Sequence, residues 1–198
     1  LFYKFIKKNY QDSLTSYDGP TFSHNLFKDY VVPNLGDKNG VLWIVIDNLR
    51  YDQYKMIEPF INNHYKKEEE YSYFSILPTA TQYARNAIFS GLMPSEMEKK
   101  HPDLWKNDTD EGGKNMFENE FLTAQIKRLN LSIKHEYYKI VSLRDGKELA
   151  SNYNGTKQND LTVLVYNFVD MLSHSKTEME VIKELAGDDK AYRSLTVS

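Results

Sequence analysis

The sequence of 198 residues contains no cysteine. Without thiols the protein has no disulfide scaffold, no cysteine-ligated zinc finger and no cysteine nucleophile, and the cytoplasm is the compartment that we expect. Any metal ion must then be held by carboxylates, imidazoles and hydroxyls. The search for chemistry therefore concentrates on aspartate, histidine and threonine.

Long apolar runs and a strong net charge are also missing. No segment approaches the roughly 20 apolar residues that cross a bilayer, and residues 1–10 lack the features of a signal peptide. The formal net charge is only −3, which argues against nucleic-acid binding driven by charge, and there is no direct DNA-binding motif. The glycine-rich dinucleotide motif, the Walker lysine loop and the GxSxG elbow are absent too. We expect neither a membrane nor DNA as a partner.

Short apolar runs bounded by turn residues alternate with helical patterns, which favours an α/β sheet with buried strands. The order β-α-β-α-α-β-β-α predicts a central sheet with helices on both faces. The predicted strands are residues 41–46, 71–77, 134–140 and 161–169, and the predicted helices are residues 52–63, 81–90, 113–129 and 176–185.

The chain ends show weaker patterns. Residues 1–39 contain helix-like and loop segments without a strong strand, so we assign them to a linker or to the end of a preceding helical domain, and residues 40–198 to the α/β domain. A long insert between Pro94 and Glu120 carries Asp108, Asp110 and Glu111, and we expect it to be a mobile surface loop.

Candidate functional residues follow the ends of predicted strands, where ligands bind in open α/β sheets. Asp47 comes directly after the apolar run 41–46, and it is either a metal ligand at the strand end or an ordinary turn or N-cap aspartate. Thr81 lies between Pro78 and Gly91, at the start of a predicted helix whose N-terminus favours a phosphate. The alternative is that Thr79 or Thr81 merely caps that helix.

Asp170 and His174 follow the second strong apolar run. Their spacing of four places both side chains on one face of a helix, where a carboxylate oxygen and an imidazole nitrogen can bind one ion. A capping or surface role is the alternative for His174. Arg50, Arg85 and Asn115 are candidates for binding a phosphate, although solvated charges on helix faces also explain the arginines.

Three segments resemble the PglZ domain of the alkaline phosphatase superfamily. They are residues 43–52 (WIVIDNLRYD), residues 75–91 (SILPTATQYARNAIFSG) and residues 166–175 (YNFVDMLSHS), each at a predicted strand end. Within this family the likeness is to the PorX-like response regulators of the type IX secretion system.

The resemblance implies zinc-dependent phosphoryl transfer to a phosphoester substrate, which we expect to be nucleotide-like. It implies that Asp47 binds the metal that activates the nucleophile, that Thr81 is the nucleophile because Gly91 follows it by ten residues, and that Asp170 and His174 bind a second zinc ion. The family completes its site with an Asp-His pair and a further histidine, and no Asp-His dipeptide occurs in this sequence. We therefore expect these residues to be the N-terminal portion of the domain, with its C-terminal part missing.

The resemblance also implies partners. A PorX-like effector domain is expected to form a homodimer and to bind a sensor histidine kinase and a sigma factor. A non-enzymatic signalling role, in which the domain keeps the fold and transmits a phosphorylation state by dimerising, is the alternative to catalysis.

Overall fold

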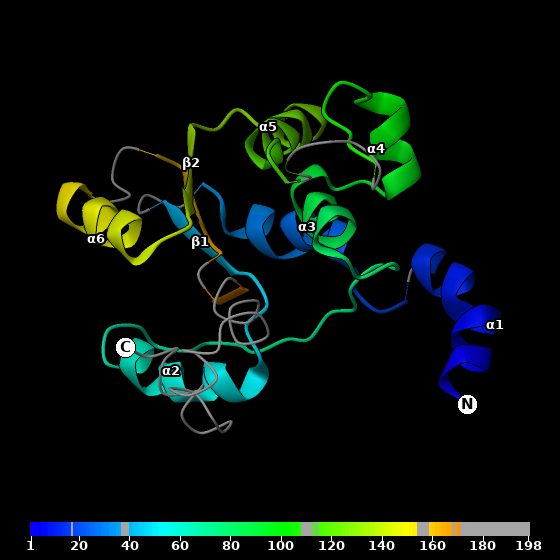
Figure 1. The fold of residues 1–198 in the computed structure, drawn as a ribbon, viewed down its shortest axis with the longest axis horizontal. Helices are drawn as coiled ribbons and strands as arrows, with labels where there is room; N and C mark the ends of the chain where they lie inside the picture. Colours follow the sequence, from blue (N-terminus) through cyan, green and yellow to red (C-terminus); the bar gives the residue numbers. More distant parts are fainter. Residues whose placement is uncertain are drawn as a thin grey trace, which may run out of the picture. The chain divides into compact units, whose positions relative to one another are not determined.

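The computed structural model describes residues 1–16, 18–36, 40–107, 113, 115–153, 159–167 and 169–170. These residues form two compact units (Figure 1). Unit 1 contains the described residues of 1–35 and 71–133, and unit 2 contains those of 36–70 and 134–170. Each unit is therefore assembled from two separate stretches of chain.

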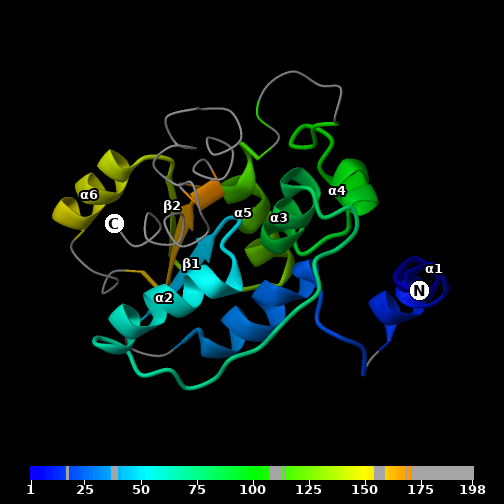
Figure 2. The ribbon, with the colours of Figure 1, turned by 60° about the horizontal axis from the view of Figure 1, so that its bottom comes forward.

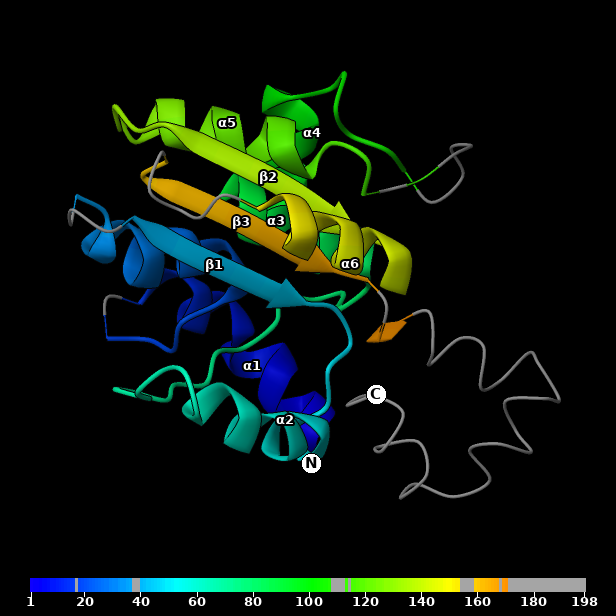
Figure 3. The same cartoon turned by 90° about the vertical axis from the view of Figure 1, so that its left-hand side faces the viewer.

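Unit 2 contains a parallel three-stranded sheet. Its strands are β1 (Val41–Ile46), β2 (His135–Ile140) and β3 (Leu161–Tyr166), and β3 lies between the other two (Figure 3). All three strands have the same length and start level with one another, so their carboxyl ends meet at one edge of the sheet. Ile46, Tyr166 and Ile140 are the last paired residues at that edge.

The sequence of β3 explains its central position. Leu161, Val163 and Val165 are fully buried on one face, and Thr162 is fully buried on the other. A strand covered on both faces needs an almost continuous apolar sequence, and β3 has one. The predicted strands 41–46 and 134–140 are confirmed with little change, whereas the predicted strand 161–169 ends early, at Tyr166.

Two described helices of unit 2 follow strands. Helix α2 (Tyr51–Asn62) comes after β1, and helix α6 (Leu143–Asn152) comes after β2 and packs against it (Figure 3). Ser142 caps α6 by accepting a hydrogen bond from the backbone N–H of Asp145 at 3.2 Å. The Asp145 carboxylate in turn accepts one from the N–H of Val141, the residue before the N-cap, at 3.3 Å.

Unit 1 is helical (Figure 2). Helix α3 (Thr81–Ser90) contacts α5 (Glu118–Arg128), α4 (Pro94–Lys100) and the short turn Ser23–Asn25. Helix α1 (Phe2–Thr15) and two further short turns, Phe27–Val31 and Val32–Asn34, complete the described elements of this unit. Its core is formed by fully buried apolar side chains from several of these segments, namely Phe27, Ile76, Phe89, Met97, Phe121 and Leu122.

The predicted strand 71–77 is wrong. This segment makes only an isolated bridge between Phe74 and Phe22, and the N–H of Ile76 donates to the hydroxyl of Ser23 instead of to another strand. Tyr71, Tyr73 and Phe74 are exposed, and among the described residues of this unit no strand pairs with this stretch. A segment with alternating aromatic residues forms a strand only where a second strand can pair with it.

The insert between Pro94 and Glu120 is not simply a loop, because α4 begins at its first residue. Proline suits the first turn of a helix, and the Glu96 side chain accepts a hydrogen bond from the N–H of Met93 at 3.0 Å. The acidic residues that defined the predicted loop lie outside the described residues. At the other end of the insert, α5 starts at Glu118 instead of Gly113, since the chain forms a turn at Asn115.

The remaining helix predictions have mixed outcomes. Residues 81–90 and 52–63 are confirmed within one residue, α6 was not predicted, and the predicted helix 176–185 lies outside the described residues. The assignment of residues 1–39 to a linker stays a prediction. Among the described residues, none of the helices combines the length and apolar character that crossing a membrane would need.

Candidate functional site

Asp47 is the first residue after β1. Its backbone N–H donates to the carbonyl of Tyr166 at 2.9 Å, so the ladder between β1 and β3 continues up to this aspartate. Asn48 follows with a φ of 57°, a left-handed conformation that asparagine tolerates better than most residues, and it turns the chain out of the sheet. The half-buried Asp47 side chain is thereby fixed at the carboxyl end of the strand.

Asp47 is not the N-cap of the helix that follows. Arg50 occupies that position, and its backbone N–H donates to the side chain of Gln53 at 2.9 Å. The guanidinium of Arg50 makes two hydrogen bonds to Asp52, at 2.9 and 2.5 Å, and both side chains are partly exposed. The capping interpretation of Asp47 is therefore wrong, and the turn at a strand end remains.

Asp170 lies beyond the end of β3, the strand next to β1. The N–H of Asn167 donates to the carbonyl of Ile140 at 2.9 Å, which continues the pairing of β3 with β2 to the same edge. Asp170 is half-buried and helical, three residues later. Unit 2 thus brings Asp47 and Asp170 to the same edge of the sheet, on the connections that follow two neighbouring strands. Burial also raises the pKa of Tyr166 at this edge.

The donor atoms at this edge suit a divalent cation in type. Two carboxylates supply oxygen ligands, and His174, which would supply nitrogen, lies outside the described residues. Among the described residues, no group of three or more aspartate, glutamate or histidine side chains is close enough together to hold a metal ion. The described part of unit 2 therefore contributes two carboxylates and no complete ligand set.

Thr81 is the first residue of α3, in unit 1. The N-cap of this helix is Ala80, whose carbonyl accepts from the N–H groups of Tyr83 and Ala84, both at 2.9 Å, and no side chain caps the helix. Thr79 is exposed and Thr81 is half-buried. The alternative that Thr79 or Thr81 caps the helix is therefore wrong, because neither hydroxyl forms a side-chain cap.

The helix that carries Thr81 is held firmly at its other end. Gly91 terminates α3 with a φ of 61°, and the side chain of Gln125 on α5 donates to the carbonyls of Ile88 and Phe89 at 3.3 and 2.7 Å. Arg128 donates to the carbonyl of Ser90. Because these contacts satisfy the last carbonyls of α3 inside the core, the helix gives Thr81 a rigid support.

Arg85 is buried rather than solvated. Only 4% of its side chain is exposed, and its Nε donates to the carboxylate of Glu118, which is 1% exposed. Asn115 is half-buried in the turn that precedes α5. The helix-face interpretation is thus wrong for Arg85, whereas it describes Arg50 well. A phosphate-binding role for Arg50, Arg85 and Asn115 stays a prediction.

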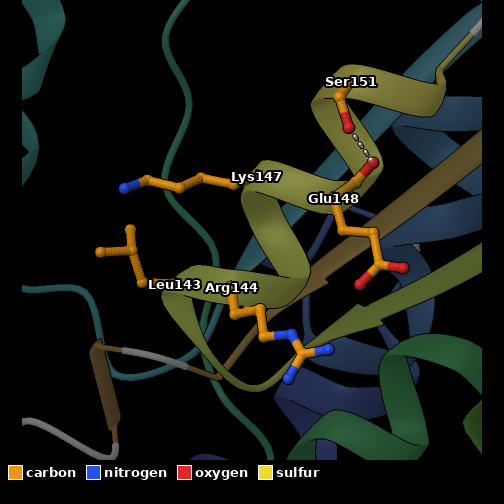
Figure 4. A pocket seen from close by; sticks show the side chains of 5 residues that line it. All are labelled: Leu143, Arg144, Lys147, Glu148 and Ser151. Carbon is orange, nitrogen blue, oxygen red and sulfur yellow. Dashed lines mark hydrogen bonds between the residues drawn. The ribbon is translucent and has the colours of Figure 1, made fainter.

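Sequence reasoning did not single out α6, which begins at the carboxyl edge of the sheet in unit 2. A shallow hollow of about 690 Å³ on this helix is lined by Leu143, Arg144, Lys147, Glu148 and Ser151. Figure 4 shows the two cations pointing in different directions, with the Ser151 hydroxyl bonded to the carbonyl of Glu148 at 2.9 Å. The pattern Ser142-x-x-Asp145 was the available signal for this helix.

Two comparisons with known proteins bear on this arrangement. A search of curated proteins finds no match. A scan against protein families matches residues 26–197 to the BREX system PglZ alkaline phosphatase-like domain, which covers most of the chain, including the connections that carry Asp47, Thr81 and Asp170. A parallel sheet flanked by helices, with aspartates following neighbouring strands, is consistent with such a domain. The chain belongs to the PglZ family of alkaline phosphatase-like domains.

Proposed function

We propose that this protein is a metal-dependent phosphoesterase that uses Thr81 as its nucleophile. The observation that carries the proposal is the position of Asp47 and Asp170 on the connections that follow the neighbouring parallel strands β1 and β3. Membership of an alkaline phosphatase-like family supports the reaction class. Two carboxylates at one strand edge suit the binding of a cation that neutralises phosphate charge.

Zinc is the metal we propose, held by Asp47, Thr81, Asp170 and His174. When bound, zinc would lower the pKa of the threonine hydroxyl and stabilise negative charge on the phosphoryl oxygens. The protein's own contribution is to hold Thr81 at the start of a buried helix, where the N-terminal N–H groups and the helix dipole favour a phosphate.

The reaction follows from these roles. The hydroxyl oxygen of Thr81 forms a bond to phosphorus, its proton is released, and the bond from phosphorus to the leaving alcohol breaks. Water then cleaves the phosphothreonine and restores the hydroxyl. The net change is one phosphoester bond hydrolysed by one water molecule.

The first experiment measures hydrolysis of a generic phosphodiester by the full-length protein supplied with zinc. Thr81→Ala should lower kcat by at least about 1,000-fold, because alanine removes the hydroxyl that attacks phosphorus. Thr123→Ala is the matched control, since Thr123 is an exposed threonine of the same unit on α5. Turnover by Thr81→Ala equal to that of the control would refute the proposal.

A second experiment tests whether residue 81 and the aspartates act on one metal ion. The chain has no cysteine, so Thr81→Cys introduces a single thiol. Cobalt(II) should then give an ultraviolet thiolate-to-metal charge-transfer band, because thiolates are soft ligands that bind such metals strongly. Adding Asp47→Asn should weaken that band, and Thr123→Cys should not produce it. A band that is independent of Asp47 would show that Thr81 does not share its metal.

We further propose that the domain is the effector of a PorX-like response regulator that acts in type IX secretion, as a homodimer that binds a sensor histidine kinase and a sigma factor. The three sequence motifs support this role. If secretion is lost in a Thr81→Ala strain with normal protein abundance, the signalling role depends on catalysis. Unaltered secretion would favour the non-enzymatic alternative.

A further inference from the structure

Unit 1 contains an apolar hollow beside the segment that leads to Thr81. The hollow has a volume of about 410 Å³ and is formed between α1 and residues 74–79. Phe2, Phe5 and Phe74 line it and are 74, 61 and 61% exposed, which is unusual for three neighbouring aromatic side chains. Its volume falls within the range of small-molecule sites.

The walls of the hollow are held together by specific contacts. The hydroxyl of Tyr10 on α1 accepts a hydrogen bond from the N–H of Leu77 at 2.8 Å. The Tyr10 ring packs edge to face against the buried Phe22 ring, with 5.8 Å between the ring centroids. The centroids of the Phe22 and Phe74 rings are 6.0 Å apart. These contacts attach α1 to the segment before α3 and keep the aromatic walls in place.

The chemistry of the lining selects its occupant. None of the described residues that line it is charged, so desolvation disfavours an ionised phosphate there, whereas an uncharged ring gains contact with aromatic walls. Thr79 lines the hollow. Thr81 is two residues further along the chain, and two peptide units span at most about 7 Å between α-carbons. A ring in the hollow can therefore belong to the same small molecule as a phosphate at Thr81.

We propose that this hollow is a specificity subsite that binds an uncharged aromatic group of the phosphoester substrate. The inference rests on the proposed function for the identity of the phosphate, whereas the aromatic walls of the hollow are formed by Phe2, Phe5, Tyr10, Phe22 and Phe74. Aromatic side chains bind rings through stacked and edge-on contacts, and they discriminate poorly between one ring and another. The subsite is thus expected to select for a ring and against a small alkyl group.

Two substrates with the same leaving group test this directly. Phenyl p-nitrophenyl phosphate and methyl p-nitrophenyl phosphate each react with one water to give p-nitrophenol and the phenyl or methyl phosphate. With the full-length protein and zinc, kcat/KM should be at least about tenfold higher for the phenyl ester, because only that ester carries a second ring that can fill the hollow while the shared p-nitrophenyl group leaves.

Two variants of α1 locate the effect. Phe5→Ala should reduce the phenyl-to-methyl ratio of kcat/KM by about tenfold. Tyr3→Ala should leave the ratio unchanged, since Tyr3 is a 71% exposed aromatic residue of the same helix that does not line the hollow. Both variants remove an exposed side chain, so their thermal unfolding should match that of the parent protein.

The outcomes separate this inference from the proposed function. If both esters are hydrolysed but the ratio is near one, or Phe5→Ala does not change it, the subsite is refuted and the phosphoesterase stands. If neither ester is hydrolysed, titration with diphenyl phosphate decides: binding that Phe5→Ala weakens tenfold supports a ring-binding hollow, and no binding refutes it. A dimer that Phe5→Ala converts to a monomer would show that a second copy covers the hollow, and would also refute the subsite.

Discussion

Replacing Glu118 by glutamine should destabilise unit 1 severely. Arg85 and Glu118 are 4 and 1% exposed, so glutamine at position 118 removes a buried carboxylate charge that faces the buried guanidinium. Such changes cost about 3–5 kcal/mol. Because a domain has a free energy of unfolding of about 5–15 kcal/mol, a fifth or more of the stability would be lost, and for a chain of this length the unfolding temperature should fall by about 6–20 °C.

The two tryptophans make the measurement selective. Trp43 lies on β1 in unit 2, and Trp105 lies in unit 1 with its ring 5.8 Å from that of Tyr83. In a Trp43→Phe background, fluorescence during urea unfolding therefore reports unit 1 alone. Comparing the midpoint with and without Glu118→Gln gives the loss in stability at constant slope.

A double variant separates a structural role of Arg85 from a role in binding phosphate. Arg85→Met combined with Glu118→Leu removes both charges and fills similar volume, so stability should return to within about 1 kcal/mol of the parent protein. If Arg85 only supports the fold, phosphodiester hydrolysis should return as well. A Glu118→Gln variant that loses less than about 1 kcal/mol would refute the reasoning from burial.

Three further predictions concern the fold and the metal. Gly91→Ala should destabilise unit 1 by about 2 kcal/mol or more in urea unfolding, because φ is 61° and the new Cβ would lie 2.0 Å from the Gln125 side-chain oxygen; an unchanged midpoint would contradict this. Hydrogen bonds from Lys55 and Lys67 lower the pKa of Glu58 to about 2, so its stabilisation is complete above about pH 4.5 and is lost as the pH falls through 2. Unfolding midpoints measured from pH 7 to pH 2 should therefore fall more in the parent protein than in Glu58→Gln, and parallel curves would exclude this contribution. Removal of metal by a chelator should abolish hydrolysis, and added zinc should restore it; activity that survives dialysis against the chelator would argue against metal dependence.

The sequence predicts the parts of this fold whose signals are local. The buried strands β1 and β3 are apolar runs, and α3 is delimited by Pro78 and Gly91, so their positions follow from neighbouring residues. The segment 71–77 has a similar local pattern but no partner strand among the described residues of its unit, and a pairing partner cannot be recognised from local sequence. Helix α6 is not predicted because Gly146 interrupts a weak helical pattern, although Ser142 caps its first turn.

The candidate site was predictable to a similar degree. The placement of Asp47 and Asp170 at one sheet edge follows from strand ends in a parallel sheet, which the sequence reveals. The burial of Arg85 does not, because its partner Glu118 lies 33 residues further along the chain. The lining of the aromatic hollow likewise joins α1 to residues 74–79, which only the tertiary structure brings together.

The order of the strands in the chain also determines when each strand can pair during synthesis on the ribosome. Val41 pairs with Leu161, so β1 leaves the ribosome about 120 residues before its only neighbour in the described sheet. At a synthesis rate of roughly 5–20 residues per second, this apolar strand stays unpaired for about 6–24 s. During that interval unit 1 can complete its own core, since its last residue, Ile133, precedes β2 and β3. The nascent chain is therefore expected to need chaperone protection at β1 well after the helix that carries Thr81 has folded.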